Sequence, residues 1–312
     1  MDFLDQYLPV NITNDSAPPP DSTYVLVAKI SLVLELTLGT GAICVTGLCL
    51  AGYLKLHRWK IPSSLIVINL LCADLMNAVL SPFHAVLCED ELDSKNRTEF
   101  FRLVFFFQAM YLFVSIFTML LMNISRLIAI LAPFQYAFLI TRRNITACLV
   151  AFWVGGLVMS FVRRFVSGTH TTFYLIVVAT QFSLQFILLL LMILSLILLK
   201  KHTQTSDVQR RATLTIAAVS LAYILSYGYY IYVTIVWMIP GLISDTSNKW
   251  VQLTAVSHLS LTIAHLFLLL NNLFNGVMFG MQPEIRKAIQ HVWVSDYYRS
   301  ILISEQKEGR SL

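Results

Sequence analysis

The chain has 312 residues, of which 57% are hydrophobic and only 12% are charged. Soluble domains carry about 25% charged residues, so this is not the composition of a water-soluble enzyme or of a disordered chain. The net charge of +5 is too small to predict a nucleic-acid partner. The sequence is that of an integral membrane protein.

Seven apolar runs are each long enough to cross a bilayer, which needs roughly 20 residues. We therefore expect an all-α fold, a seven-transmembrane helix bundle at 25–280. An N-terminal tail at 1–24 precedes the bundle, and a C-terminal segment at 281–312 follows it. The predicted helices are 25–54, 61–87, 101–131, 144–166, 173–199, 211–239 and 251–280.

Lysine and arginine are unevenly distributed among the short loops between these helices. The first, third and fifth loops are basic, and the second is acidic. Because basic loops stay in the cytoplasm, we expect a multi-pass protein of the plasma membrane with its N-terminus outside. Only Arg163 and Arg164 fall on the wrong side. The residues that define the pattern are Lys55, Arg58, Lys60, Arg142, Arg143, Lys200, Lys201, Arg210 and Arg211, against Glu89, Asp90, Glu91 and Asp93.

Three glycosylation sequons lie on the expected outer side, at Asn11, Asn14 and Asn96. Their placement agrees with the orientation, and we expect all three to carry glycan. Sequons also begin at Asn123 and Asn144, but these fall at the inner surface and should stay unmodified.

A short amphipathic segment follows the seventh helix. It begins at Pro283, which suits the first turn of a helix, and Ile285 and Ile289 are one turn apart. With Arg286 and Lys287 between them, the pattern predicts a helix lying on the inner membrane surface. An ordinary charged tail is the alternative.

Polar side chains occur inside several of the predicted spans. Asp74 is in the middle of the second span, and a carboxylate at that depth costs several kcal/mol. Ser115, Asn271 and Asn275 are at matching depth in the third and seventh spans. Oxygen atoms of these types hold a small hard cation such as Na⁺, or a proton. The alternative is a hydrogen-bonded cluster that fixes helix packing. Glu35 in the first span has no assigned role.

The residues around Arg126 resemble a known signature. The stretch from Met122 to Tyr136 reads MNISRLIAILAPFQY and is similar to the odorant-receptor sequence M-A-Y-D-R-Y-V-A-I-C-x-P-L-x-Y. The resemblance covers about residues 25–292 and implies a rhodopsin-like (class A) G-protein-coupled receptor, in a divergent odorant branch. The other stretches that resemble this family are Pro62 to Asp74, Arg211 to Thr215, Ser226-Tyr227-Gly228, and Asn275 to Phe279.

The resemblance also implies roles for individual residues. The four polar residues around Asp74 fall on the family's sodium-site positions. Arg126, which by itself would be read as reaching for lipid headgroups, becomes the contact for the C-terminal helix of a heterotrimeric G protein. We expect Pro133, Arg210 and Arg211 to share that coupling surface. In this branch the G protein is of the stimulatory type, which raises cyclic AMP.

Several family motifs are altered in this chain. The acidic residue before Arg126 is Ser125, which removes a charge-assisted pair expected in the resting receptor. The tyrosine after Arg126 is Leu127, and Gly276 replaces the proline of the seventh helix. Phe101 stands where the family has the cysteine of its extracellular disulfide, so either the outer face is looser than in the family or its cover is built differently. Altered positions of the first and seventh helices are Ala42 and Phe279.

The expected ligand is a small neutral molecule that enters between the third, fifth, sixth and seventh helices. Gln108 stands where amine receptors carry an aspartate, which disfavours a salt-bridged amine. Tyr227, Tyr230 and His265 add polar groups to an apolar pocket. Tyrosines at helical spacing are also common packing residues, so that reading stays open.

Other functional classes fit less well. A retinal protein needs a lysine in the seventh span, and none lies between Lys249 and Lys287. A transporter would show an internal repeat, and no recognisable nucleophile, metal motif or aspartyl pair suggests an enzyme. The remaining alternative is a receptor-like protein that no longer signals and acts as a homo- or heterodimer partner or in trafficking.

Overall fold

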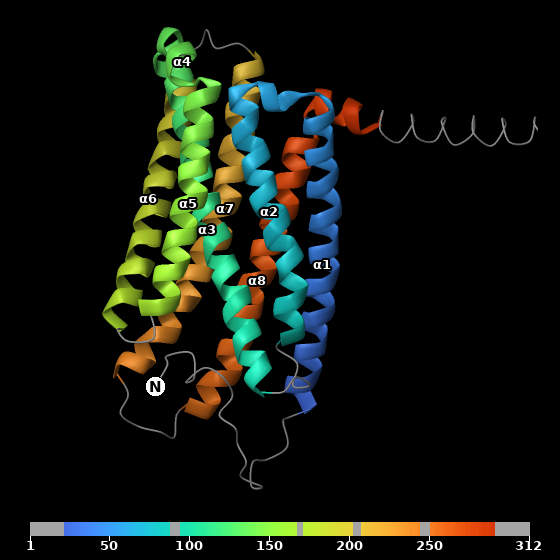
Figure 1. The fold of residues 1–312 in the computed structure, drawn as a ribbon, viewed down its shortest axis with the longest axis vertical. Helices are drawn as coiled ribbons and strands as arrows, with labels where there is room; N and C mark the ends of the chain where they lie inside the picture. The colour runs from blue at the N-terminus through green and yellow to red at the C-terminus, as the bar shows by residue number, and fades with distance from the viewer. Residues whose placement is uncertain (1–21, 88–93, 167–170, 202–206, 244–249, 291–312) are drawn as a thin grey trace, which may run out of the picture.

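The computed structural model describes residues 22–87, 94–166, 171–201, 207–243 and 250–290, and all the regular structure in them is helical. Seven helices contain apolar segments long enough to cross a membrane, which confirms the predicted fold class (Figure 1). They are α1 (Ser22–Lys55), α2 (Pro62–Leu87), α3 (Ser94–Leu131), α5 (Arg142–Val166), α6 (Thr171–Lys201), α7 (Asp207–Ile243) and α8 (Trp250–Gly280).

Two short elements were not expected from the sequence. A 3₁₀ turn, η2 (Arg58–Lys60), joins α1 to α2, and α4 (Pro133–Leu139) joins α3 to α5. The chain enters η2 through His57, whose φ of 52° is left-handed. Pro133 opens α4, because its missing N–H costs nothing in the first turn of a helix.

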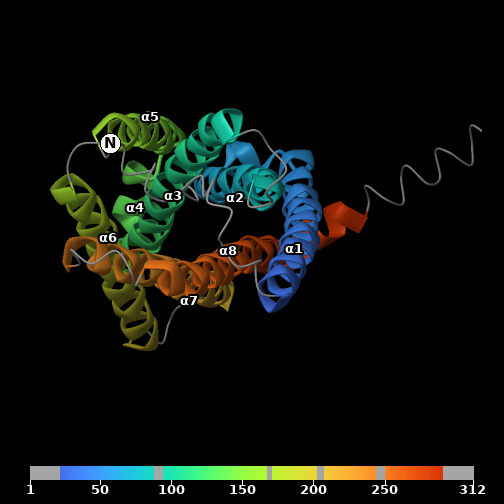
Figure 2. The same ribbon diagram turned by 90° about the horizontal axis from the view of Figure 1, so that it is seen from below.

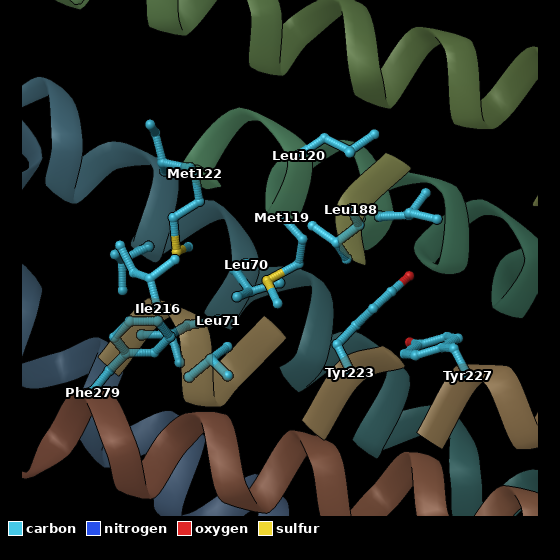
Figure 3. Close-up of a cluster of buried hydrophobic side chains, with 14 of the residues drawn as sticks. Leu70, Leu71, Met119, Leu120, Met122, Leu188, Ile216, Tyr223, Tyr227 and Phe279 are labelled. Atoms are coloured by element: carbon cyan, nitrogen blue, oxygen red, sulfur yellow. The ribbon is translucent and has the colours of Figure 1, made fainter. Parts of the chain in front are cut away.

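The helix α3 is the centre of the bundle. It packs against α2, α5 and α6 and touches α7, and Figure 2 shows it crossing the bundle between α5 and α8. The helix α8 packs between α1 and α7 and also reaches α2. Apolar side chains from five helices meet in this core (Figure 3). They include Leu70 and Leu71 of α2, Met119 and Met122 of α3, Leu188 of α6, Ile216 of α7 and Phe279 of α8.

The outward faces of the helices are apolar. Phe182 and Phe186, one turn apart on α6, are 59% and 55% exposed. No other part of the described chain covers them, and exposed aromatic side chains on this scale need an apolar solvent. The lipid bilayer is therefore the medium that this surface fits.

Residues 283–290 form the short helix expected after the last span. The sequence analysis placed its apolar face on the membrane surface, but Ile285 is 1% exposed and packs on α1. The Cγ2 methyl group of Ile285 and the Cγ1 methylene group of Ile289 lie 3.1 and 3.2 Å from the position that a Cβ atom on Gly52 would occupy. An ion pair between Arg58 and Glu284 and a hydrogen bond of 3.1 Å from Tyr53 to Gln282 hold the same junction. This helix is thus attached to protein on that face.

Most of the described lysines and arginines lie at one end of the bundle, where α1, α3, α6 and α8 finish, although Lys29, Lys95, Arg97, Arg102, Arg163 and Arg164 lie at the other end. We call the end that holds most of them the basic end; in Figure 1 it is the upper end, where α4 lies. The sequence analysis expects this end in the cytoplasm. Its basic residues are Lys55, Arg58, Lys60, Arg142, Arg143, Lys200, Lys201, Arg210, Arg211, Arg286 and Lys287.

Candidate functional site

Asp74 lies in the core of the bundle, where its side chain is 1% exposed. The Nδ2 atom of Asn275 donates a hydrogen bond of 2.9 Å to its Oδ2 atom. The neighbouring Asn272 donates a bond of 3.3 Å to the backbone carbonyl of the same residue. Two amides of α8 therefore hold the middle of α2, and the structure brings together two of the four predicted cation ligands.

The other two predicted ligands are buried in the same core. Ser115 of α3 is 2% exposed and is hydrogen-bonded to Tyr227 of α7. Asn271, also 2% exposed, has no hydrogen-bond partner at either atom of its amide group. A buried amide without partners is costly, so Asn271 favours a bound polar species over a purely structural cluster. The Oδ1 atoms of Asn272 and Asn275 also lack partners.

Arg126 is half-buried near the basic end of α3. The hydroxyl of Ser125, which stands in place of the family's acidic residue, donates a bond of 2.8 Å to the Met122 carbonyl instead. Within the described residues Arg126 makes no ion pair, and its Nε atom has no hydrogen-bond partner. The structure therefore agrees with the expectation that Arg126 lacks the charged partner found in the family.

A side-chain hydrogen bond joins α3 to α7 near Arg126. The Nδ2 atom of Asn123 on α3 donates a hydrogen bond of 2.8 Å to the Ser220 hydroxyl on α7. Both side chains are fully enclosed, at 1% and 0% exposed. The sequence analysis considered Asn123 only as a sequon, and its burial here agrees with the expectation that it stays unmodified.

Comparison with known proteins identifies the fold family. The family model "7 transmembrane receptor (rhodopsin family)" matches residues 47–174, from α1 to the start of α6. That range contains Asp74, Ser115 and Arg126, and the seven membrane-length helices complete the topology. Over residues 47–174 the chain is similar to the rhodopsin-family receptors. No curated protein matches the sequence significantly.

Similarity to this non-enzymatic receptor family implies, in general terms, ligand binding and coupling to a G protein. The residues expected to make the coupling surface lie on the basic end of the receptor. Pro133 is exposed at the start of α4, and Arg210 and Arg211 are exposed in the first turns of α7. Sequence reasoning missed two aromatic residues of α4, Phe134 and Phe138, which are 89% and 80% exposed.

The four residues predicted to bind ligand divide between two cavities of the receptor. Gln108 and His265 line the first cavity, between α2, α3 and α8, together with Asn77 and Ser81. The second cavity lies between α3, α6 and α7, where Gln185 lines it with three tyrosines. Each cavity has a volume of about 10 Å³, which is room for about one water molecule. The tyrosines of the second cavity are Tyr223, Tyr227 and Tyr230.

Two contacts connect these cavities. The side-chain nitrogen of Gln108 lies 3.2 Å from His265 Nδ1. The His265 ring then meets the Tyr230 ring edge-on, with centroids 6.0 Å apart. A change at Gln108 thus reaches α7 through His265, and α7 is the helix that Ser220 ties to α3. Tyr223 and Tyr227 stack with centroids 4.0 Å apart, which supports their reading as packing residues.

The structure shows what surrounds several positions at which this chain departs from the family motifs. A Cβ atom at Gly276 would lie 3.0 Å from Thr46 Oγ1 and 3.2 Å from its backbone nitrogen, so the glycine allows α8 to approach α1. Ala42 packs with Ala78 and Leu269 and is fully buried. Glu35, whose position was open, faces the bundle at 3% exposed.

A polar network of α2, α3 and α5 was not anticipated. Trp153 Nε1 donates to Asn69 Oδ1 at 2.8 Å, and Asn69 Nδ2 donates to Thr118 Oγ1 at 2.8 Å. In the sequence Asn69 and Thr118 are each one of several polar residues in their spans, which does not reveal that they meet Trp153.

Some predictions concern residues that the structure does not place. Asn11, Asn14 and Cys88 lie outside the described residues. Asn96 falls in the first turn of α3, where the sequence analysis expected a loop. The other four cysteines, Cys44, Cys49, Cys72 and Cys148, are free thiols.

Proposed function

We propose that this receptor is of the chemosensory type, that it binds a small neutral molecule, and that it activates a stimulatory G protein at its basic end. The coupling proposal rests on the observation that no acidic residue in the described part of the chain holds Arg126. Its guanidinium has no ionic partner among the described residues and lies beside the exposed surface of α4 and α7. An unpaired arginine is available to a carboxylate or a backbone carbonyl of the G protein's C-terminal helix.

The chemosensory assignment rests on the sequence resemblance around Arg126 and Tyr227, and the absence of charge around the cavities supports a neutral ligand. In the proposed orientation the N-terminus is outside, so both cavities lie toward the outer half of the bundle. We further propose a sodium site at Asp74, Ser115, Asn271 and Asn275. The unpaired Asn271 amide supports a site of this kind.

The resting state of such a receptor depends on contacts between α3 and α7. With no acidic partner for Arg126, the Asn123–Ser220 bond is the buried polar link between these helices near the basic end. A typical hydrogen bond contributes about 0.5–1.5 kcal/mol. Removing the Asn123–Ser220 bond, where it stabilises only the resting state, would raise the active population roughly two- to tenfold.

The test is ligand-independent cyclic AMP in transfected cells, with surface expression matched through an N-terminal tag. Wild type should give a basal signal, Arg126→Ala should abolish it, and Ser220→Ala should raise it. Ser195→Ala is the matched control, because Ser195 is similarly buried but donates only to Leu191 within α6. A basal signal that survives Arg126→Ala would contradict the coupling role of this residue.

The second candidate is a receptor-like protein that does not signal and acts as a homo- or heterodimer partner or in trafficking. The changes at Ser125, Leu127 and Gly276 favour it, because they fall in motifs linked to activation in the family. Under this reading no variant produces cyclic AMP, including Ser220→Ala. Cells treated with an odorant panel do not produce it either. Association with a co-expressed receptor would then be measured by energy transfer between labelled chains.

A further inference from the structure

The cavity between α2, α3 and α8 contains polar atoms that the protein itself does not satisfy. Gln108 is 6% exposed and Ser81 is 8% exposed. The Oε1 atom of Gln108 and the Oγ atom of Ser81 are both buried without a hydrogen-bond partner in the described part of the chain. Buried polar atoms in native proteins are nearly always paired, so two such atoms lining one cavity indicate a bound polar group.

The second cavity differs in this respect. Among the described residues that line it, no buried side-chain oxygen or nitrogen lacks a partner. Tyr227 is hydrogen-bonded to Ser115 and stacks on Tyr223, and Tyr230 contacts His265. The demand for an external hydrogen-bonding group is therefore specific to the first cavity.

The unpaired atoms restrict the chemistry of that group. An amide oxygen only accepts, whereas a serine hydroxyl can donate or accept. A hydroxyl group satisfies both at once, since it can donate to Gln108 and accept from Ser81. An ether or a ketone has no hydrogen to donate and would leave the Gln108 oxygen unpaired.

The remainder of the lining argues against a charged ligand. Among the described residues that line the cavity there is no lysine, arginine, aspartate or glutamate, and an unpaired charge is strongly disfavoured in such surroundings. The side-chain nitrogen of Gln108 also lies 3.2 Å from His265 Nδ1. Apart from Asn77, the other lining residues are apolar and suit a hydrocarbon body: Leu80, Val104, Leu268 and Leu269.

We infer that the receptor's ligand is a neutral hydroxyl compound whose hydroxyl group binds between Gln108 and Ser81, in the α2–α3–α8 cavity. This inference rests on the proposed function in that it names the ligand class of the same receptor. The cavity has room for about one water molecule, so the ligand hydroxyl replaces a water and its apolar body widens the cavity. The Nε2 atom of the same Gln108 side chain contacts His265, whose ring meets Tyr230 of α7, so the ligand site is connected to α7.

The test measures binding without a G protein. The full-length receptor is purified into lipid nanodiscs, and its unfolding temperature is recorded against increasing 2-phenylethanol and cyclohexanol. Three compounds related to 2-phenylethanol serve as controls: ethylbenzene, 2-phenylethylamine and phenylacetate. We expect a saturable rise in the unfolding temperature with at least one hydroxyl compound and none with the controls. No rise with either alcohol, or an equal rise with ethylbenzene, would overturn the inference.

Variants then locate the site. Gln108→Leu should abolish the response, and Ser81→Ala should weaken apparent affinity about three- to tenfold, the effect of one hydrogen bond. Without ligand, Ser81→Ala should unfold no earlier than wild type, because its hydroxyl has no partner to lose. Gln185→Leu is the matched control, equally buried at 6% exposed but in the second cavity. A response that survives Gln108→Leu, or that Gln185→Leu abolishes, places the ligand elsewhere.

This experiment separates the two proposals. A receptor that binds alcohols but raises no cyclic AMP keeps the site and loses the signalling proposal. A receptor with Arg126-dependent basal signalling but no response to the alcohols keeps the signalling and loses the ligand class.

Discussion

Asp74 is the residue whose environment is most unusual for its chemistry. Its carboxyl group is enclosed in the core, and within the described residues it has no cationic partner. The amide of Asn275 supplies one hydrogen bond, which does not neutralise a charge. A buried ionised carboxylate without a counter-charge costs several kcal/mol, so a proton or a bound cation must offset the charge.

The sodium proposal gives a direct prediction at this residue. NaCl should stabilise the purified wild-type receptor against unfolding relative to the same concentration of choline chloride. At a sodium concentration ten times the dissociation constant, the gain is about 1.4 kcal/mol. Asp74→Asn should remove the difference between the two salts, as measured by thermal unfolding.

Glu35→Gln is the control for that experiment, because Glu35 is the other buried carboxyl group of the described transmembrane core. It should retain the full sodium effect. If Asp74→Asn also retains it, the cation binds elsewhere, and the Asp74 cluster is a packing feature.

At the scale of elements, the close approach of α1 and α8 depends on a glycine. Thr46 of α1 donates a hydrogen bond of 3.4 Å to the Asn272 carbonyl of α8, next to the position where Gly276 has no side chain. The same stretch of α8 carries Asn272 and Asn275, which hold Asp74. The packing of α1 therefore helps to determine where the candidate cation ligands lie.

Gly276→Ala should destabilise the receptor. Its Cβ atom would meet Thr46 and Val45 at 3.0–3.2 Å, and the nearby backbone cannot rotate away. Overpacking of this kind costs about 1–3 kcal/mol, which would appear as a lower unfolding temperature in nanodiscs.

Gly47→Ala on α1 is the matched substitution, because no atom lies within 4 Å of its Cβ position. Alanine is the better helix former, so this variant should be as stable as wild type or slightly more stable. Equal destabilisation by both substitutions would show that the packing at Gly276 is not the cause.

At the scale of the whole molecule, charge distinguishes the two ends of the bundle. The basic end contains Arg142, Arg143, Arg210 and Arg211, all exposed, around the surface where Arg126 and α4 lie. Positive residues flanking spans are retained in the cytoplasm. The same asymmetry therefore predicts both the orientation and the side on which a G protein is met.

Glycosylation tests this orientation. In mammalian cells the receptor should carry N-linked glycan, seen as a mobility shift that peptide N-glycosidase removes. Substitution of Asn11, Asn14 and Asn96 by glutamine should abolish the shift, and an N-terminal tag should be accessible on intact cells. Asn123→Gln and Asn144→Gln should leave the shift unchanged. A tag that is detected only after permeabilisation would reverse the orientation.

The sequence by itself determined the spans and their order. A long apolar segment is stable as a helix in lipid, so the lengths of the apolar runs are enough to predict seven helices. The predicted range 61–87 and the helix Pro62–Leu87 nearly coincide. The candidate site was also partly accessible, because a carboxylate at Asp74 and amides at Asn271 and Asn275 stand out in apolar runs.

Only the tertiary structure decided which of these groups meet. Side-chain pairing between helices depends on the rotation and tilt of each span, and a span such as α6 is apolar on all sides, so its sequence does not mark an inward face. Gln108 and His265 therefore separate from Tyr227 and Tyr230 into a different cavity, and Asn123 finds Ser220. Ile285 likewise packs against α1, because the junction at Gly52 offers it an apolar surface that the helix sequence alone could not reveal.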